Sequence, residues 1–273
     1  MKLAEVHAAR GRIRGGVIQT PCKRSQSFHE QIPCRLFWKF ENLQRTGSFK
    51  DRGALNRLLR LSEEERERGV VTASAGNHAQ AVAYHASRLG IASTVVMPEF
   101  TPLIKVGNTR RYGAKVIQQG STLSDGLKEV HRIVDEEGLT LVHAFDDEAV
   151  IAGQGTIGLE LLDEIPELDT VVVPIGGGGV ISGIAVAVKA LKPSVRVVGV
   201  EAAAAASAKA SREAGQIVAI ESAETLADGI AVKRIGERTF PIIQELVDDI
   251  VTVEEEEIAR AILLLLEREK TVV

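Results

Sequence analysis

The chain has 273 residues, of which 45% are hydrophobic and 26% are charged, and its formal net charge at pH 7 is −4. This composition is ordinary for a globular protein, and the charge gives no electrostatic reason to expect a nucleic-acid or membrane-surface partner. No apolar run reaches the ~18 residues that cross a bilayer, and no signal-peptide pattern follows Met1. The two cysteines, Cys22 and Cys34, form no metal motif, so we expect reduced thiols in a cytoplasmic protein with no metal site.

The first elements lead to one unusual lysine. A helix is expected over Leu3–Arg14 and an apolar strand over Arg35–Phe40, followed by the stretch FENLQRTGSFKDRGALN. In it, Ser48 and Asp51 have the spacing of a capping box, which predicts a helix that starts at Ser48. Lys50 then lies in the first helical turn, where the helix dipole disfavours a cation and lowers the ammonium pKa. Such an amine suits nucleophilic catalysis, although a lysine alone is more often a solvated surface charge.

From Val70 onward, short apolar strands alternate with amphipathic helices, after a charged and solvated run at 63–68. Strands are expected at 70–74, 93–97, 115–118 and 139–143, with helices at 77–89, 103–112 and 123–137 between them. A second series has strands at 170–173, 196–200 and 249–253, and helices at 149–162, 182–191, 202–210, 239–246 and 254–269. The pattern predicts an α/β fold with two open, mostly parallel sheets flanked by helices. We expect a large domain of residues 1–47 plus 147–273, with a small domain of residues 48–146 inserted in it.

Two loops between a strand and a helix carry ligand-binding chemistry. The loop SAGNH at 74–78 opens a helix, so its backbone N–H groups suit a carboxylate or a phosphate. The loop PIGGGGVISG at 174–183 has four glycines that let the backbone wrap around an anion. It fits neither a dinucleotide fingerprint nor a P-loop, so one phosphate is expected and no triphosphate or dinucleotide.

A lysine amine, one phosphate cradle and an asparagine loop together indicate pyridoxal phosphate, bound to the lysine as a Schiff base. With the further segments FDDEAVIAGQGTIGLE and LADGIAVKRIGERTF, these motifs resemble the fold-type II pyridoxal-phosphate enzymes, whose fold is like that of the tryptophan synthase β subunit. Within that group the chain is most similar to the threonine (serine) dehydratases, of the catabolic kind. The resemblance covers nearly the whole chain, with the motifs in the family's order.

The resemblance implies a role for each motif. Lys50 forms the Schiff base with pyridoxal 5′-phosphate and then removes the substrate α-proton. Phe49 packs beside the cofactor ring, and Asn77 bonds to the ring's 3′ oxygen. The phosphate is held by Gly176, Gly177, Gly178, Gly179 and the Val180 amide.

The substrate carboxylate, by the same resemblance, lies in the asparagine loop of Ser74, Ala75, Gly76, Asn77 and His78, where the amides of all but Ala75 bind it. The implied reaction is β-elimination from L-threonine or L-serine, which gives 2-oxobutanoate or pyruvate plus ammonia. The cofactor phosphate is the implied proton donor to the leaving hydroxyl. The expected partners are a small amino acid and further copies of the chain, as a dimer or a tetramer.

Three departures from the family pattern narrow this interpretation. Serine racemases carry a second serine where this chain has Ala75, so elimination without efficient racemisation is favoured. Their divalent-cation site uses acidic residues at the positions of Glu201 and Ser207, and here it looks incomplete. The family's residue opposite the pyridine nitrogen follows the segment EKTVV, at which this sequence ends, so a truncated form is expected.

Two alternatives remain open. One is a serine racemase or D-amino-acid dehydratase of the same fold. The other is a catalytically impaired protein that binds pyridoxal phosphate or a nucleotide.

Overall fold

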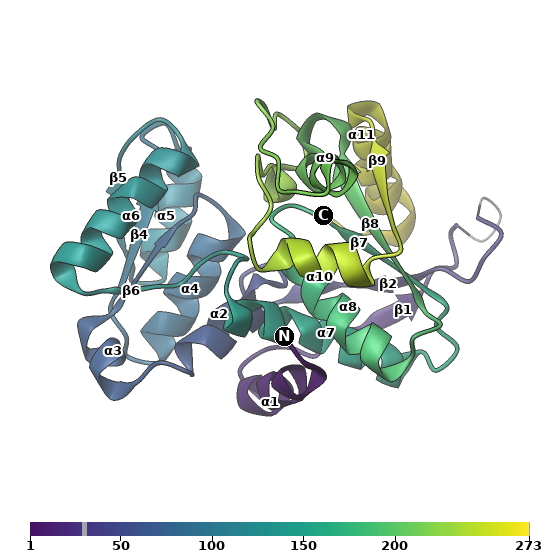
Figure 1. The fold of residues 1–273 in the computed structure, drawn as a ribbon, viewed down its shortest axis with the longest axis horizontal. Helices are drawn as coiled ribbons and strands as arrows, with labels where there is room; N and C mark the ends of the chain where they lie inside the picture. The colour runs from purple at the N-terminus through teal and green to yellow at the C-terminus, as the bar shows by residue number, and fades with distance from the viewer. Residues whose placement is uncertain (29–31, 273) are drawn as a thin grey trace. The chain divides into compact units, whose positions relative to one another are not determined.

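The computed structural model describes residues 1–28 and 32–272, which form two compact units. The first unit contains residues 1–18 and 44–156, and the second contains residues 19–43 and 157–273 (Figure 1). The predicted small domain lies within the first unit, which also takes in residues 1–18 and 147–156. These extra residues belong to it because α1 (Leu3–Ile13) and the start of α7 (Glu148–Glu164) pack on α2 (Lys50–Leu58).

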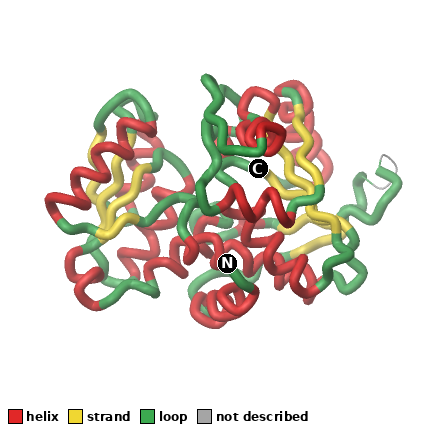
Figure 2. Tube along the Cα trace, in the orientation of Figure 1, coloured by secondary structure: helices red, strands yellow, loops and turns green. Residues whose placement is uncertain are grey.

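The first unit is built on a four-stranded parallel sheet in the order β5-β4-β3-β6. Its strands are β3 (Val70–Ala73), β4 (Ser93–Met97), β5 (Lys115–Gln118) and β6 (Thr140–Leu141). The helices between and before them are α3 (Glu63–Arg68), α4 (Asn77–Arg88), α5 (Leu103–Arg111) and α6 (Leu123–Glu137). The strands of this unit stand together between helices in Figure 2.

Alternate strand residues face helices on opposite sides of this sheet. Val70 and Val95 pack in clusters with α2, α4 and α5, whereas Val71 and Val96 pack against Val130 and Ile133 of α6. Because successive strand residues point to opposite faces, this alternation shows that both faces are covered. The carboxyl ends of parallel strands share one edge, so the loops after β3 and β6 lie side by side.

The second unit contains a three-stranded parallel sheet in the order β7-β8-β9 and an antiparallel pair of short strands. The sheet strands are β7 (Thr170–Pro174), β8 (Arg196–Ala202) and β9 (Asp249–Val253), and the pair is β1 (Cys22–Arg24) with β2 (Phe37–Lys39). Its other helices are α8 (Gly179–Leu191), α9 (Ser207–Ala214), α10 (Thr239–Leu246) and α11 (Glu255–Leu264), which continues as a π-helical turn at Leu265–Glu269. Short 3-10 turns lie at Glu41–Leu43, Ala203–Ala205 and Asp228–Ile230.

This architecture confirms the predicted α/β class with open, mostly parallel sheets flanked by helices. The sheet of the second unit is less covered than we expected. Val171 and Val173 are buried in β7, whereas Val172 between them is 65% exposed. Among the described residues, no helix is both long and apolar enough to cross a membrane.

Candidate active site

The helix that carries Lys50 begins two residues later than predicted. α2 starts at Lys50, and the predicted capping box is wrong because the Asp51 carboxylate turns to Thr46. It accepts hydrogen bonds from the Thr46 amide, at 3.2 Å, and from the Thr46 hydroxyl, at 2.5 Å. Lys50 nevertheless occupies the first helical turn, as expected.

The Lys50 amine lies in a desolvated place within the first unit. Its Nζ donates a hydrogen bond of 2.7 Å to the Ala144 carbonyl oxygen, in the loop after β6, and lies 5.3 Å from the centre of the Phe49 ring. Burial lowers the pKa of Lys50 from its ordinary 10.5 to about 8. A substantial neutral fraction therefore exists near neutral pH, as a nucleophile or base requires. Burial, rather than the helix dipole we invoked, is the cause of this shift.

The asparagine loop meets Lys50 at the same edge of the first sheet. α4 starts at Asn77, whose exposed side-chain amide makes no hydrogen bond to any described residue. The Ser74 amide donates to the Val96 carbonyl oxygen at 3.1 Å, and the Ser74 hydroxyl accepts from the Gly76 and Ala79 amides at 3.3 Å. The expected carboxylate donors Ser74 and Gly76 are thus already engaged, whereas the Asn77 and His78 amides in the first turn of α4 donate to no described residue and suit an anion.

The imidazole of His78 is buried beneath this loop. Its Nε2 lies 3.0 Å from the Val142 carbonyl oxygen, and its Nδ1 has no partner among the described residues. The pKa of His78 is lowered to about 3, chiefly by burial and then by the Lys50 charge. The ring is therefore neutral at pH 7 and packs as part of the first unit.

The glycine loop of the second unit has the form of an anion cradle. It follows β7, and α8 begins at Gly179, three residues before the predicted start at Ser182. Within the described residues, the N–H groups of Gly176, Gly177 and Gly178 donate no hydrogen bond. Unpaired N–H groups at the start of a 13-residue helix suit a phosphate.

The shape of this cradle depends on glycine. Gly178 has φ +91°, and a Cβ there would lie 2.8 Å from Thr239 Oγ1 and from Ile243 Cδ1. The Thr239 hydroxyl in turn donates to the Gly177 carbonyl oxygen at 2.8 Å, which holds the carbonyl away from the N–H groups. The unpaired N–H groups of this loop suit a phosphate, and the Lys50 amine of the first unit suits an aldehyde; pyridoxal phosphate carries both groups. The role of Thr239 was not predicted, since the motif that contains it gave no signal for it.

Glu201, the acidic residue at the position of the family's cation site, is engaged by backbone N–H groups. The Glu201 carboxylate accepts from the Ala208 and Lys209 amides, both at 2.8 Å, and so caps α9. Within 1–28 and 32–272, no three His, Cys, Asp or Glu side chains gather closely enough to hold a metal ion.

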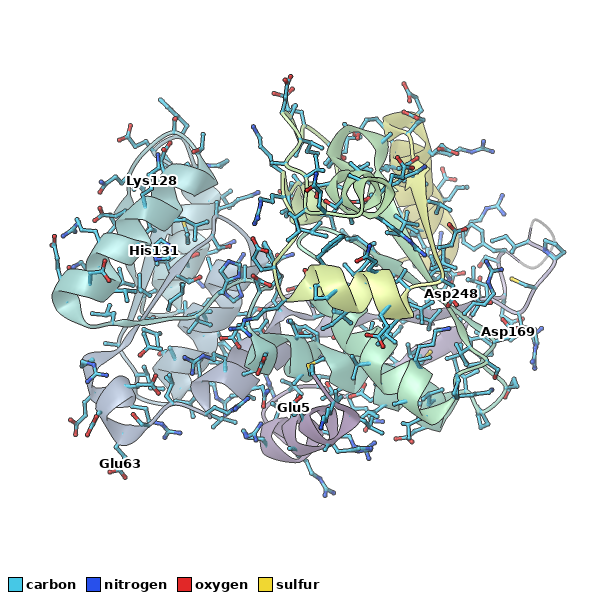
Figure 3. All side chains as sticks on the ribbon, viewed as in Figure 1. Glu5, Glu63, Lys128, His131, Asp169 and Asp248 are labelled. Atoms are coloured by element: carbon cyan, nitrogen blue, oxygen red, sulfur yellow. The ribbon has the colours of Figure 1, made fainter. Side chains whose placement is uncertain are left out.

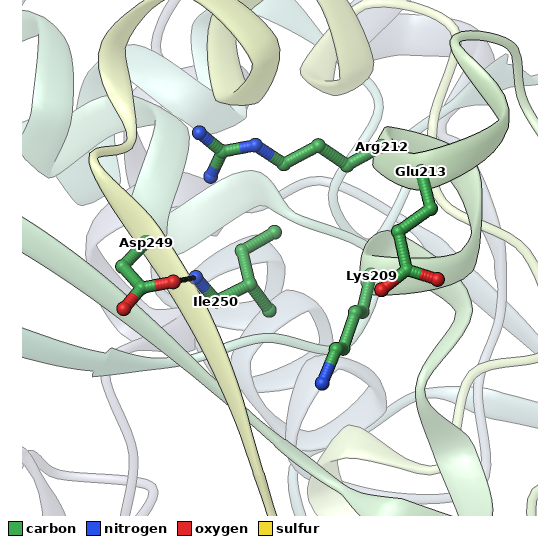
Figure 4. Close-up of a pocket in the computed structure, with 5 residues that line it drawn as sticks. All are labelled: Lys209, Arg212, Glu213, Asp249 and Ile250. Atoms are coloured by element: carbon green, nitrogen blue, oxygen red, sulfur yellow. Dashed lines mark hydrogen bonds between the residues drawn. The ribbon is translucent and has the colours of Figure 1, made fainter.

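A cavity of about 410 Å³ is lined by Lys209, Arg212, Glu213, Asp249 and Ile250 (Figure 4). It lies at the amino end of β9, away from the carboxyl edge where the glycine loop begins.

Comparison with known proteins agrees with these features. The family model for the pyridoxal-phosphate dependent enzymes matches residues 13–273. An L-threonine ammonia-lyase of Geobacter sulfurreducens is 52% identical over 98% of this chain and 67% of its own length. A T.th. threonine deaminase superposes with a TM-score of 0.95 at 45% identity, over 100% of this chain and 89% of that one.

A maize serine racemase has a TM-score of 0.97 at 38% identity, over 100% of this chain and 82% of the racemase chain. The family match and the relatives agree on the cofactor. The chain belongs to the pyridoxal-phosphate-dependent enzymes of fold type II, and its cofactor is pyridoxal phosphate.

Proposed function

We propose that the chain is an ammonia-lyase that converts L-threonine to 2-oxobutanoate and ammonia, L-serine to pyruvate and ammonia, or both. The observation that carries the proposal is the Lys50 amine, with its pKa lowered to about 8, at the sheet edge that the asparagine loop shares. The names of the relatives, a threonine ammonia-lyase and a threonine deaminase, supply the substrate class.

Separate roles are proposed for the groups of each unit. In the first unit, the amides of Asn77 and His78 bind the substrate carboxylate, while the Ser74 hydroxyl, which accepts from the Gly76 and Ala79 amides, shapes the loop around Ala75. The Asn77 amide bonds to the cofactor's 3′ oxygen, and Phe49 packs beside its ring. In the second unit, the cradle of Gly176 to Gly179 and the Val180 amide hold the phosphate.

Lys50 performs the proton transfer. When bound, pyridoxal phosphate supplies an electron-withdrawing ring that stabilises negative charge on the substrate α-carbon. The neutral Lys50 Nζ would take the α-proton, and the β-hydroxyl would leave as water on gaining a proton. Hydrolysis of the released enamine, as its imine, would then consume one water and give the 2-oxo acid and ammonia. A base with a pKa of about 8 suits this transfer, because the best catalytic pKa lies near the working pH.

L-threonine and L-serine differ by one methyl group. A single methyl or methylene group in a pocket is worth only ~1–3 kcal/mol, so both substrates are expected to react. Parallel assays with threonine and serine give the ratio of the two kcat/KM values directly.

A serine racemase is the second candidate, favoured by the similarity to the maize enzyme. Ala75 opposes it, because alanine has no hydroxyl with which to protonate the opposite face of the α-carbon. Chiral chromatography after incubation with L-serine separates the two functions. If D-serine forms faster than pyruvate, the chain is a racemase and our proposal is wrong.

The central experiment compares Lys50→Ala with Lys128→Ala, whose side chain is 79% exposed on α6. We expect wild type and K128A to develop an absorbance band near roughly 410–420 nm with pyridoxal phosphate and to release 2-oxo acid. K50A is expected to do neither. A wild-type chain that develops the band but yields no 2-oxo acid from either substrate would instead be an impaired binding protein.

The proposal includes three further expectations, which concern the domain, the assembly and the location of the protein. We propose that residues 48–146 act as the small domain, that the chain assembles as a dimer or tetramer, and that it works in the cytoplasm. Light scattering tests the assembly, since a mass near the chain's own 29.3 kDa would contradict it.

A further inference from the structure

The turn that follows β6 is closed by a histidine side chain. The Nδ1 atom of His143 accepts hydrogen bonds from the backbone N–H of Asp146, at 2.8 Å, and of Phe145, at 3.3 Å. A side-chain acceptor that binds N–H groups two and three residues onward is the arrangement by which Asn and Asp close turns. The His143 and Phe145 rings also meet edge to face, with centroids 4.7 Å apart.

This turn contains the carbonyl group that binds Lys50. Ala144 lies between His143 and the two amides that His143 holds, so the orientation of its peptide group is fixed by the turn. Its oxygen accepts the 2.7 Å hydrogen bond from Lys50 Nζ. An amine that donates one hydrogen to this oxygen has its lone pair directed away from Ala144.

We propose that His143 is a positioning residue for Lys50: its neutral ring closes the turn that presents the Ala144 carbonyl to the lysine amine. The proposal rests on the proposed function, in which Lys50 is the reactive amine. His143 acts through this turn and needs no contact of its own with the substrate or the cofactor.

The ring must be neutral to do this, and its surroundings favour that state. The pKa of His143 is lowered, first by burial and then by the charges of Lys50 and of His131 on α6, while Asp146 and Asp147 oppose the shift. His131 is labelled on α6 in Figure 3. His78 is a further titratable group close enough for His143 to affect its pKa. Since Nδ1 accepts two N–H groups, the single proton of the neutral ring lies on Nε2.

A matched pair of variants separates the acceptor from the bulk of the ring. In His143→Asn the amide oxygen takes the place of Nδ1 and keeps the turn closed. In His143→Gln the longer side chain places its amide where Nε2 was, so the Phe145 and Asp146 amides lose their acceptor. Circular dichroism checks that both variants fold.

The test measures the proton affinity of Lys50 in the apoprotein. Competitive acetylation with acetic anhydride at a series of pH values, read by peptide mass spectrometry, gives the pKa of Lys50 in each variant. We expect H143N to match wild type and H143Q to fall by about one unit, because a carbonyl acceptor stabilises an ammonium more than a neutral amine. A Lys50 pKa in H143Q that equals the wild-type value, or rises towards 10.5, would overturn the proposal.

Two further measurements on the apoprotein examine the turn itself. Nitrogen-15 resonances of His143 should show an unprotonated Nδ1, and the Asp146 amide should exchange faster in H143Q than in wild type or H143N. A protonated Nδ1 at pH 7 would also refute the assignment. None of these readouts depends on turnover, so a chain without lyase activity would refute the proposed function and leave the role of His143 testable.

Discussion

At the scale of single residues, the protein holds a lysine amine in a place that disfavours its charge. Among the described residues, the Lys50 ammonium forms no ion pair, and its one hydrogen-bond acceptor is a neutral carbonyl. Its pKa is about 8 in the folded chain, against an ordinary 10.5. Between these values the unfolded chain binds more protons than the folded one, so this residue's contribution to stability rises with pH through that window.

Replacing Lys50 with methionine is therefore expected to stabilise the apoprotein at pH 7, by roughly 1–3 kcal/mol, because the cost of a buried charge disappears. The advantage of K50M over wild type should shrink as pH rises from about 8 towards 10.5, where the lysine is neutral in the folded state. Urea unfolding of both apoproteins at pH 7 and pH 10 measures the difference. The exposed Lys128→Met serves as the control, and a K50M effect that is equal at both pH values would contradict the argument.

At the scale of elements, the position of α2 depends on a close approach of two helices in the first unit. A Cβ on Gly153 of α7 would lie 2.6 Å from the Arg52 carbonyl oxygen and 2.7 Å from the Gly53 Cα of α2. A Cβ on Gly53 would lie 2.8 Å from the Val150 carbonyl oxygen. The two glycines thus allow a backbone contact that fixes the helix whose first residue is Lys50.

Gly153→Ala is expected to destabilise the chain by about 1–3 kcal/mol, because one of the two backbones must move. The control is Gly107→Ala on α5, where a Cβ would meet nothing within 4 Å and should stabilise the helix by up to ~1 kcal/mol. Denaturant midpoints report both effects. Equally small changes in the denaturant midpoints of the two variants would show that the close contact between α2 and α7 tolerates a methyl group.

The elements also show which features are encoded locally. The strands at 93–97, 115–118 and 249–253 were predicted with their observed bounds, since each has an apolar run bounded by turn residues. The predicted starts of α2 and α8, and the predicted place of α9, were wrong because these depend on side-chain-to-backbone hydrogen bonds and on a glycine run, which residue spacing does not specify. Asp51 turns to Thr46, and Glu201 caps α9 from the end of β8. The pair β1 and β2 was half missed, because a three-residue strand has no periodicity of its own.

Some features of the candidate site could likewise be predicted from the sequence, and others could not. Lys50, the asparagine loop and the glycine loop could be proposed from residue types that suit an amine, a carboxylate and a phosphate. The Ala144 carbonyl could not be predicted as a partner of Lys50, because any residue type has a backbone oxygen. A role for His143 could be proposed only once the structure showed that its Nδ1 accepts backbone N–H groups.

At the scale of the whole molecule, α7 contributes residues to both units, since the division falls after Thr156 within this helix. Unfolding of either unit would therefore expose or fray part of a helix on which the other depends. This shared helix leads us to expect one cooperative unfolding transition rather than two.

Pyridoxal phosphate should shift that single transition to higher temperature. A ligand at about 100 times its Kd stabilises the native state by about 2.7 kcal/mol, and covalent attachment at Lys50 adds to this. In K50A the shift should be smaller but present, because the glycine loop still binds the phosphate. Differential scanning calorimetry of both proteins, with and without cofactor, measures the effect. Two separate transitions would contradict the prediction of one, and a wild-type transition that does not move when the cofactor is added would contradict cofactor binding.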